Sequence, residues 1–259
     1  MGDRRMNAGP IVKVSGLRKR FGSGPLVLDG IDLEVVRGEF VSFIGPSGCG
    51  KSTLLRLIAG LSPASEGSIT VEGLTPEQAR QRMFFVFQDA NLIPWRRVTE
   101  NVELPLLLRG DAPAHRQECV ARMLEVVGLS GAAEKYPWQL SGGMRMRVSI
   151  ARALSVAPEI LLLDEPFGAL DEMTRDRLNE DLLAIRSRAP FTGFFVTHSV
   201  AEAVFLSSRI VVLGANPGRV TAVIDVPFAY PRQPELRESP PFLRLLATTA
   251  QALRAVRPA

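Results

Sequence analysis

A glycine-rich loop in the first quarter of the chain has the residue types and spacing of a phosphate-binding site. It matches the pattern G-x-x-x-x-G-K-[ST], follows the apolar run 40–44 and precedes the largely apolar run 54–59. In such a loop, successive backbone N–H groups turn toward phosphate oxygens, and the following helix adds its positive dipole end. We therefore predict a nucleoside triphosphate site. Its residues are Gly45, Pro46, Ser47, Gly48, Cys49, Gly50, Lys51, Ser52 and Thr53.

Four residues of this loop have different expected tasks. Lys51 reaches the β- and γ-phosphates, Ser52 ligates Mg²⁺ through its hydroxyl, and Thr53 can hydrogen-bond the α-phosphate. Cys49 is expected to contribute its backbone N–H rather than its thiol, because this phosphate chemistry uses no thiol. The alternative is an ordinary glycine turn, which the apolar run before the loop and the helix-like run after it disfavour.

Two adjacent carboxylates, Asp164 and Glu165, end the apolar run 160–163. A run of this kind is typical of a buried parallel strand whose carboxyl end faces a site. Asp164 is then expected beside Mg²⁺. Glu165 is expected to accept a proton from the water that attacks the γ-phosphate, because phosphoryl transfer to water needs an oriented nucleophile. The alternative is that both carboxylates only cap the next helix.

The segment 140–144 reads LSGGM and is followed by a basic, helix-like stretch. LSGG is the signature of the ATP-binding-cassette (ABC) ATPases, and the chain resembles this family in the motif and in its position between the glycine loop and the carboxylates. Ser141 and the amides of Gly142 and Gly143 open a helix, which makes a second anion site. The resemblance implies that this site closes over the γ-phosphate bound by another subunit. We therefore expect a head-to-tail homodimer with ATP sandwiched between the subunits.

Four further side chains match functional positions of the same family. The resemblance implies that Gln88 touches Mg²⁺ or the attacking water, and that His198 contacts the γ-phosphate. It also implies that Asp171 communicates across the dimer, and that Phe21 stacks on adenine. For Phe21 the alternative is packing in the core, and for His198 it is an ordinary surface or core position.

The order of these motifs predicts a P-loop NTPase of the α/β class. The resemblance implies an ABC-type nucleotide-binding domain over residues 10–228, in which a RecA-like core carries an antiparallel β-subdomain. Apolar residues on one helix face predict a helical subdomain at about 89–157. We expect the C-terminal extension 229–259 to be extended and then helical, because prolines interrupt its first part. Early strands are expected at 11–14, 26–28, 31–36, 40–44 and 68–71, and later ones at 160–163, 194–197 and 210–213.

Composition agrees with one compact α/β unit. The chain has 259 residues, 46% of them hydrophobic, and a mild net charge of +4 that we interpret as solvated surface. Its apolar runs are far shorter than the roughly 20 residues that cross a bilayer, and we see no secretion signal. Cys49 and Cys119 form no disulfide framework and fit a reducing compartment. We therefore expect a cytoplasmic protein.

Two classes of function are compatible with an ABC ATPase of this size. The leading hypothesis is the ATP-hydrolysing subunit of a membrane importer, peripheral at the cytoplasmic face of the inner membrane. Its partners would be integral-membrane permease subunits and a separate extracytoplasmic substrate-binding protein. The alternative is a soluble ABC ATPase that acts on nucleic acid or ribosomes. Such proteins usually carry two cassettes or a long coiled-coil insertion, so we expect no nucleic-acid partner. The signature and the lack of an N-K-x-D motif exclude small GTPases and simple kinases.

Three segments, 86–95, 166–175 and 216–220, resemble the nitrate, sulfonate, taurine and bicarbonate import ATPases. The likeness spans about residues 10–228 and implies a small, anionic or sulfonate-like solute. Met144 and Met146 depart from the wider family, in which glutamine is frequent. Asn216 departs from this group, in which arginine is frequent. The solute itself stays open, because an importer ATPase does not touch its cargo.

Trp95 lies a few residues after Gln88, at the entry to the expected helical subdomain. A soluble enzyme has little reason to place such a side chain beside arginines at a mobile joint, whereas a docking groove gains from a large aromatic side chain that packs against a partner helix. We therefore expect a short cytoplasmic helix of the permease to dock here. Burial of Trp95 in the core is the alternative.

Overall fold

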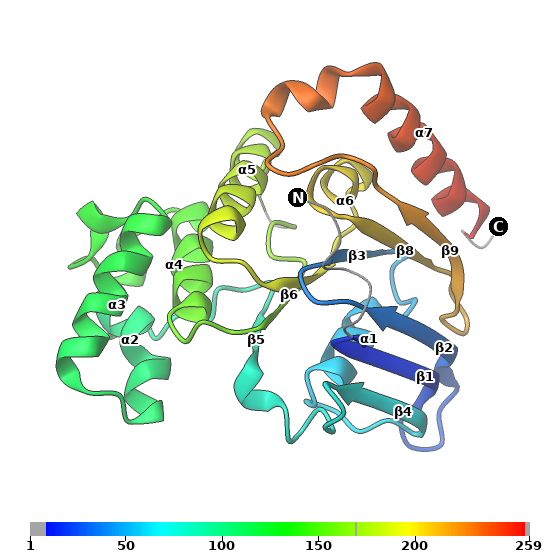
Figure 1. The fold of residues 1–259 in the computed structure, drawn as a ribbon, viewed down its shortest axis with the longest axis horizontal. Helices are drawn as coiled ribbons and strands as arrows, with labels where there is room; N and C mark the ends of the chain where they lie inside the picture. The colour runs from blue at the N-terminus through cyan, green and yellow to red at the C-terminus, as the bar shows by residue number, and fades with distance from the viewer. Residues whose placement is uncertain (1–8, 169, 257–259) are drawn as a thin grey trace.

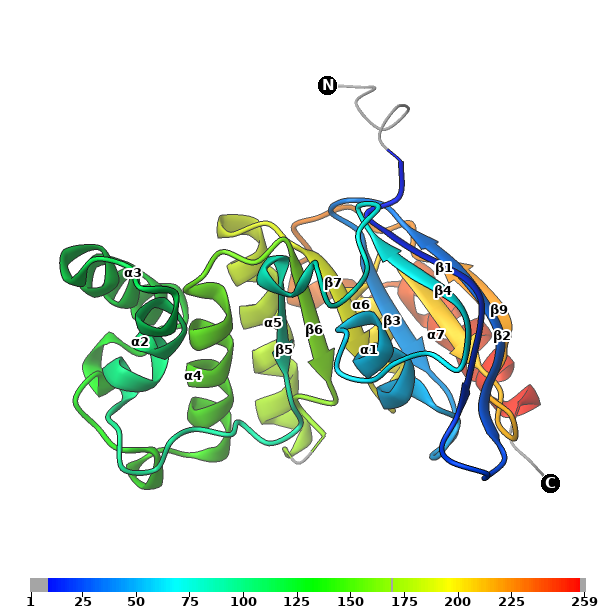
Figure 2. The ribbon, with the colours of Figure 1, turned by 90° about the horizontal axis from the view of Figure 1, so that it is seen from below.

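The computed structural model describes residues 9–168 and 170–256. Two β-sheets form the body of the molecule, and helices separate and cover them (Figures 1 and 2). A group of three helices projects from one end, opposite the smaller sheet (Figure 2). None of the helices in these two ranges combines the length and the apolar character needed to cross a membrane.

The smaller sheet is antiparallel, with the order β2-β1-β4. Its strands are β1 Val12–Arg20, β2 Leu26–Val35 and β4 Glu66–Val71. The expectation of two strands at 26–28 and 31–36 was wrong, because β2 is one strand. Leu17 pairs with Ile31 while Lys19 pairs with Leu28, so three residues of β2 lie opposite two of β1. The extra residue makes a bulge at Gly30, whose φ of +64° favours glycine, and the bulge interrupts the apolar pattern.

The larger sheet has the order β5-β6-β7-β3-β8-β9. Its first five strands are parallel, and β9 runs antiparallel at the edge. The sequence reading missed β9, whose side chains alternate between half-buried and exposed. Every residue of β3, β6 and β7 is buried, as expected of a parallel sheet covered on both faces. The strands are β5 Met83–Val86, β6 Ile160–Asp164, β7 Thr192–Val196, β3 Phe40–Ile44, β8 Arg209–Leu213 and β9 Val220–Asp225.

Helix α1, Lys51–Ile58, lies between the two sheets (Figure 2). Helices α5, Glu172–Arg188, and α6, Val200–Leu206, cover the opposite face of the parallel sheet. Successive side chains of each strand point to opposite faces. In β3, Val41 and Phe43 therefore join the core cluster around α1, whereas Phe40 and Ile44 join the cluster around α5 and α6.

The projecting group consists of α2 Val98–Arg109, α3 Pro113–Val126 and α4 Gly142–Leu154. These helices occupy most of the region 89–157, in which the sequence predicted helices. Their apolar faces meet in a core that includes Val102, Leu106, Met123 and Leu124. The packing holds the beginning of α4, and with it the LSGG segment, away from the antiparallel sheet (Figure 2).

The C-terminal segment is irregular over 226–233, forms a short 3₁₀ helix over Pro234–Glu238 and ends in α7, Pro240–Ala255 (Figure 1). Residues 257–259 of the expected extension lie outside the described residues. Arg232 is buried, and its guanidinium donates to the carbonyl oxygens of Val204, Phe205, Ser207 and Phe228 at 2.7–3.1 Å. Three of these carbonyls belong to the C-terminal end of α6, where a helix leaves acceptors unpaired. The extension therefore closes one end of α6, the helix whose other end lies beside His198.

Candidate functional site

The glycine loop joins β3 to α1 and lies at the carboxyl edge of the parallel sheet. Gly48 and Gly50 have φ of +76° and +95°, left-handed conformations that favour glycine. The ammonium of Lys51 donates to the carbonyl oxygens of Gly45 and Pro46, at 3.0 Å each. Lys51 is only 4% exposed, so its charge is held inside the loop, where phosphate oxygens can replace these neutral acceptors.

One cavity of about 280 Å³ brings together three motifs that are distant in the sequence. The glycine loop and the first turn of α1 supply most of its wall. The other lining side chains include Glu165, which follows β6, and His198, which comes after β7. The parallel strands β3, β6 and β7 are neighbours, so the loops that follow them meet at one edge. The lining residues are Val27, Ser47, Gly48, Gly50, Lys51, Ser52, Thr53, Glu165 and His198.

Ser52 and Asp164 meet beside this cavity. The Ser52 hydroxyl donates to Asp164 Oδ1 at 2.6 Å, and the Asp164 side chain is largely buried. A hydroxyl and a carboxylate that share one corner next to a phosphate loop are the oxygen ligands that Mg²⁺ takes, together with phosphate and water. The donor set therefore fits Mg²⁺. Arg56 lies further out, with Nη2 3.9 Å from Asp164 Oδ2.

Glu165 and His198 form a close pair, with 2.7 Å between Glu165 Oε1 and His198 Nε2. Glu165 has a φ of +49°, an uncommon conformation for a residue with a side chain. Its backbone is fixed there, because its N–H donates to Val196 and its carbonyl accepts from Gly168. The alternative that Asp164 and Glu165 cap the next helix is wrong. Asp171 caps α5, where its Oδ1 accepts the N–H of Thr174 at 3.0 Å.

Gln88 follows β5 and lines a smaller pocket of about 110 Å³, which shares Glu165 and His198 with the first cavity. Asp171 is the exposed cap of α5, and the N–H of Thr174 lowers the pKa of its carboxyl. Phe21 is 54% exposed at the end of β1, with Lys19 Nζ 4.6 Å from its ring centroid. Core packing of Phe21 is therefore excluded. Within the described residues, neither Phe21 nor Gln88 lines the larger cavity.

The LSGG segment begins α4, away from the glycine loop. Ser141 is the N-cap, and its hydroxyl accepts the N–H of Met144 at 3.3 Å. A Cβ on Gly142 would lie 3.3 Å from Leu170, and one on Gly143 would lie 3.2 Å from Thr174. Both glycines thus allow α4 to pack closely against the start of α5. No described residue of α4 lines the nucleotide-sized cavity.

Comparison with known proteins agrees with this arrangement. A family model described as "ABC transporter" matches residues 28–168. The chain belongs to the ABC transporter family. An aliphatic sulfonates import ATP-binding protein from Bacillus cereus is 44% identical over 224 residues, which are 85% of this chain and 88% of the relative. A bicarbonate transport ATP-binding protein from Synechocystis is 46% identical over 224 residues, 85% of this chain but 34% of that protein.

A solved structure has the same fold. It is a dimeric ATP-binding cassette in a post-hydrolysis state bound to ADP and Pi, 33% identical, with a TM-score of 0.74 over 84% of this chain and 100% of that chain. The predicted fold class and the resemblance to bicarbonate and sulfonate ATP-binding subunits are confirmed. The chain is an ATP-binding cassette and an ATPase.

The cassette has one contact at its glycine loop that sequence reasoning did not assign. Gly218 donates its N–H to Val27, accepts the N–H of Asp29, and lies against the backbone of Cys49. A Cβ on Gly218 would come within 2.1 Å of the Cys49 carbonyl oxygen. The sequence marked 216–220 only as a subgroup likeness, although a glycine after a proline does signal a tight turn. The Cys49 thiol is buried, and burial raises its pKa.

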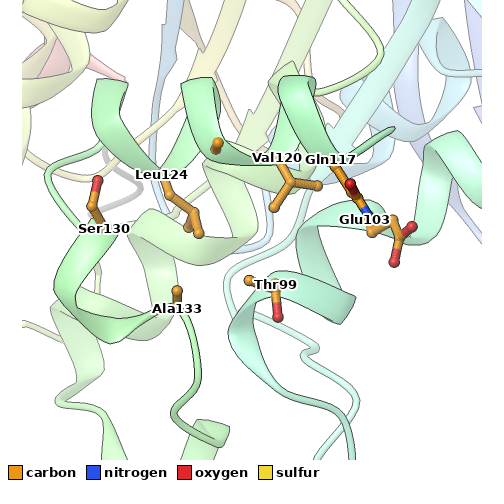
Figure 3. Close-up of a pocket in the computed structure, with 8 residues that line it drawn as sticks. Thr99, Glu103, Gln117, Val120, Leu124, Ser130 and Ala133 are labelled. Atoms are coloured by element: carbon orange, nitrogen blue, oxygen red, sulfur yellow. The ribbon is translucent and has the colours of Figure 1, made fainter. Parts of the chain in front are cut away.

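A cavity of about 340 Å³ lies elsewhere, inside the helical group (Figure 3). Val120 and Leu124 of α3 face it, and Thr99 and Ala133 lie across from them (Figure 3). Glu103 at its rim is paired with Arg116, whose Nε lies 2.7 Å from Glu103 Oε1. None of the described residues predicted to bind nucleotide lines this cavity, so we assign it no part in the ATP site.

Replacement of Gly218 by alanine tests the contact at the loop. We expect Gly218→Ala to weaken ATP binding by about 10-fold or more, because the Cys49 carbonyl must move and small misplacements are costly at such sites. Gly131→Ala is the matched control, since a Cβ there meets nothing within 4 Å. Nucleotide titration and thermal unfolding of both variants provide the measurement. Wild-type affinity in a folded Gly218→Ala protein would contradict the role of Gly218.

Proposed function

We propose that this cassette is the ATP-hydrolysing subunit of a membrane importer for a small, anionic or sulfonate-like solute. The observation that carries the proposal is the cavity lined by the glycine loop, Ser52 and the Glu165–His198 pair, with Asp164 hydrogen-bonded to Ser52 beside it. The names of the sulfonate and bicarbonate relatives, matched over 85% of this chain, support import as the process that hydrolysis drives. Neither the cavity nor the relatives support a nucleic-acid substrate.

In this proposal each side chain at the cavity has one task. Lys51 exchanges its carbonyl acceptors for β- and γ-phosphate oxygens. Ser52, Asp164 and Gln88 would hold Mg²⁺, and the bound ion would neutralise charge that develops on the phosphates. Glu165 accepts the proton of the attacking water, and His198 holds Glu165 and the γ-phosphate in register. The close Glu165–His198 contact supports this pairing of base and positioning group.

A second copy of the cassette completes the site. Ser141, Gly142 and Gly143 open α4 and do not line the cavity of their own subunit. We propose that they close over the γ-phosphate held by the partner's glycine loop, and that Asp171 lies at the same interface. The dimeric cassette with ADP and Pi supports this assembly. Phe21, exposed at the end of β1, is proposed to stack on adenine.

The permease is proposed to dock between the sheet and the helical group. A largely apolar groove of about 430 Å³ lies there, lined by Phe84, Phe85 and Phe87 of the β5 region and by Leu104 and Leu108 of α2. Leu108 is 79% exposed and Trp95 is 75% exposed, so the alternative that Trp95 is buried in the core is wrong. Asn91 lines the groove only four residues before Trp95. Exposed aromatic and leucine side chains beside Gln88 suit a partner helix.

This assembly would place the cassette at the cytoplasmic face of the inner membrane. The permease would span the membrane, and an extracytoplasmic binding protein would select the solute. The movement of the helical group relative to the sheet would transmit nucleotide state, because the groove borders both bodies.

Glu165→Gln tests the catalytic base. The variant keeps the shape of the side chain but cannot accept the proton, so we expect ATP binding to persist while turnover falls at least ~100-fold. Lys51→Ala should instead lose affinity for ATP, because it removes a phosphate contact. Equilibrium binding and steady-state phosphate release separate the two effects. Near-normal turnover of Glu165→Gln would remove Glu165 from the mechanism.

Mixed dimers test the shared site. Lys51→Ala subunits combined with Ser141→Arg subunits place both lesions in one composite site and leave the other intact. We expect each parent to be inactive. In a random mixture about half the dimers are mixed, and each mixed dimer has one intact site of two. The mixture should therefore recover roughly a quarter of wild-type activity if intact sites work independently. Differently tagged subunits allow the mixed dimer to be isolated. An isolated mixed dimer without activity would mean that Ser141 does not act across the interface.

Trp95→Ala tests the docking site in the cassette reconstituted with its permease and binding protein. We expect solute uptake to fall by about 10-fold while basal ATP hydrolysis stays, because the variant loses an aromatic side chain that the docked permease would bury and leaves the ATP cavity untouched. A cysteine at Arg96 should crosslink to the permease, and one at Leu243, on the exposed surface of the distant α7, should not. Native Cys49 and Cys119 are buried and should not compete. Crosslinking from Leu243 alone would place the membrane contact on the other end of the molecule.

A further inference from the structure

A buried carboxylate beside the catalytic pair has no task in the proposed mechanism. Glu202 lies in the first turn of α6 and is only 5% exposed. Burial raises the pKa of its carboxyl. Burying a carboxylate costs free energy unless hydrogen bonds or ion pairs compensate for the lost hydration. Its neighbours therefore indicate why the chain places it there.

One oxygen of Glu202 holds the loop that carries His198. Glu202 Oε2 accepts the hydroxyl of Thr197, and Thr197 Oγ1 in turn accepts the N–H of Ser199 at 2.9 Å. The N–H of Glu202 donates back to the Ser199 hydroxyl at 3.3 Å. Both residues that flank His198 are thus tied to Glu202, and His198 itself contacts Glu165.

The other oxygen faces the helix that begins at Asp171. Glu202 Oε1 lies 3.8 Å from Arg175 Nε, and neither atom has a hydrogen-bond partner among the described residues. Arg175 Nη2 donates to the carbonyl oxygen of Leu170 at 2.7 Å. Arg175 therefore joins the loop before α5 to Glu202. The pocket of about 110 Å³ lined by Gln88, Glu165 and His198 is also lined by Arg175, Thr197 and Glu202.

Resting on the proposed role of His198, we propose that Glu202 is a positioning residue that sets His198 against Glu165. The same carboxylate links the His198 loop, through Arg175, to the loop that precedes α5. Glu202 touches neither the glycine loop nor the cavity that holds the phosphates. Its loss should therefore lower the rate of hydrolysis and leave ATP affinity in place.

A double-mutant cycle with His198, in which kcat and ATP affinity of the whole chain are measured, separates positioning of His198 from general stabilisation of the fold. We expect Glu202→Gln to lower kcat about 5- to 10-fold and to leave ATP affinity within about 2-fold. In the His198→Ala background we expect Glu202→Gln to have no further effect on kcat, because the group it positions is gone. Asp181→Asn is the matched control. Asp181 is a partly buried carboxylate 2.7 Å from Arg147, between α5 and α4, and its effect should not change when His198 is removed.

The hydroxyl of Thr197 provides a second test if Glu202→Gln folds poorly. Thr197→Ser keeps the donor and should retain near wild-type kcat, whereas Thr197→Val removes the hydrogen bond to Glu202 and should lower kcat at least as much as Glu202→Gln, whose amide oxygen can still accept this hydroxyl. Wild-type kcat in folded Glu202→Gln or Thr197→Val, or losses that simply multiply in the double variant, would overturn this inference alone. Full activity of His198→Ala would overturn the proposed role of His198, and this inference with it.

Discussion

The parallel pairing of β3, β7 and β6 is the constraint on which the rest of the structure depends. Phe43 of β3 and Asp164 of β6 both pair with Val196 of β7, so the three strands end side by side. Both faces of the strands are buried, so their side chains are apolar or small, apart from Thr192 at the start of β7 and Asp164 at the end of β6. The chemistry therefore starts where the strands stop, with the glycine loop, the two carboxylates and His198.

Several charged side chains lie at this edge of the sheet, and the fold holds each of them in position. The ammonium of Lys51 is held by backbone carbonyls, and Asp164 is held by the Ser52 hydroxyl, so each buried charge keeps a partner before nucleotide is bound. Glu165 occupies a left-handed backbone conformation that the hydrogen bonds to Val196 and Gly168 maintain. Strain of this kind at a functional position is a cost that the surrounding sheet and loop offset.

The sequence was sufficient to predict the family, because the motifs that mark it are short local patterns. The glycine loop, the Asp164–Glu165 strand and the LSGG helix start each carry their chemistry within a few residues, and comparison confirmed the family that they predict. The contact between Gly218 and Cys49 could not be predicted in this way, because it joins residues that are far apart in the sequence through backbone atoms. The bulge at Gly30 was missed for a related reason. A single inserted residue breaks the apolar alternation of β2, although pairing with β1 continues on both sides.

The link from Arg175 to Thr197 through Glu202 shows why side-chain networks are harder to predict than motifs. Each residue taken alone is an ordinary polar side chain on a helix or in a loop. Only the packing of α5 against α6 brings these side chains into contact. That packing has a wider consequence. The loop before α5 lies against Gly142 at the start of α4, and Arg232 of the C-terminal segment closes the far end of α6. The His198 loop is thus attached, through two helices, both to the surface proposed to meet a second subunit and to the C-terminal extension.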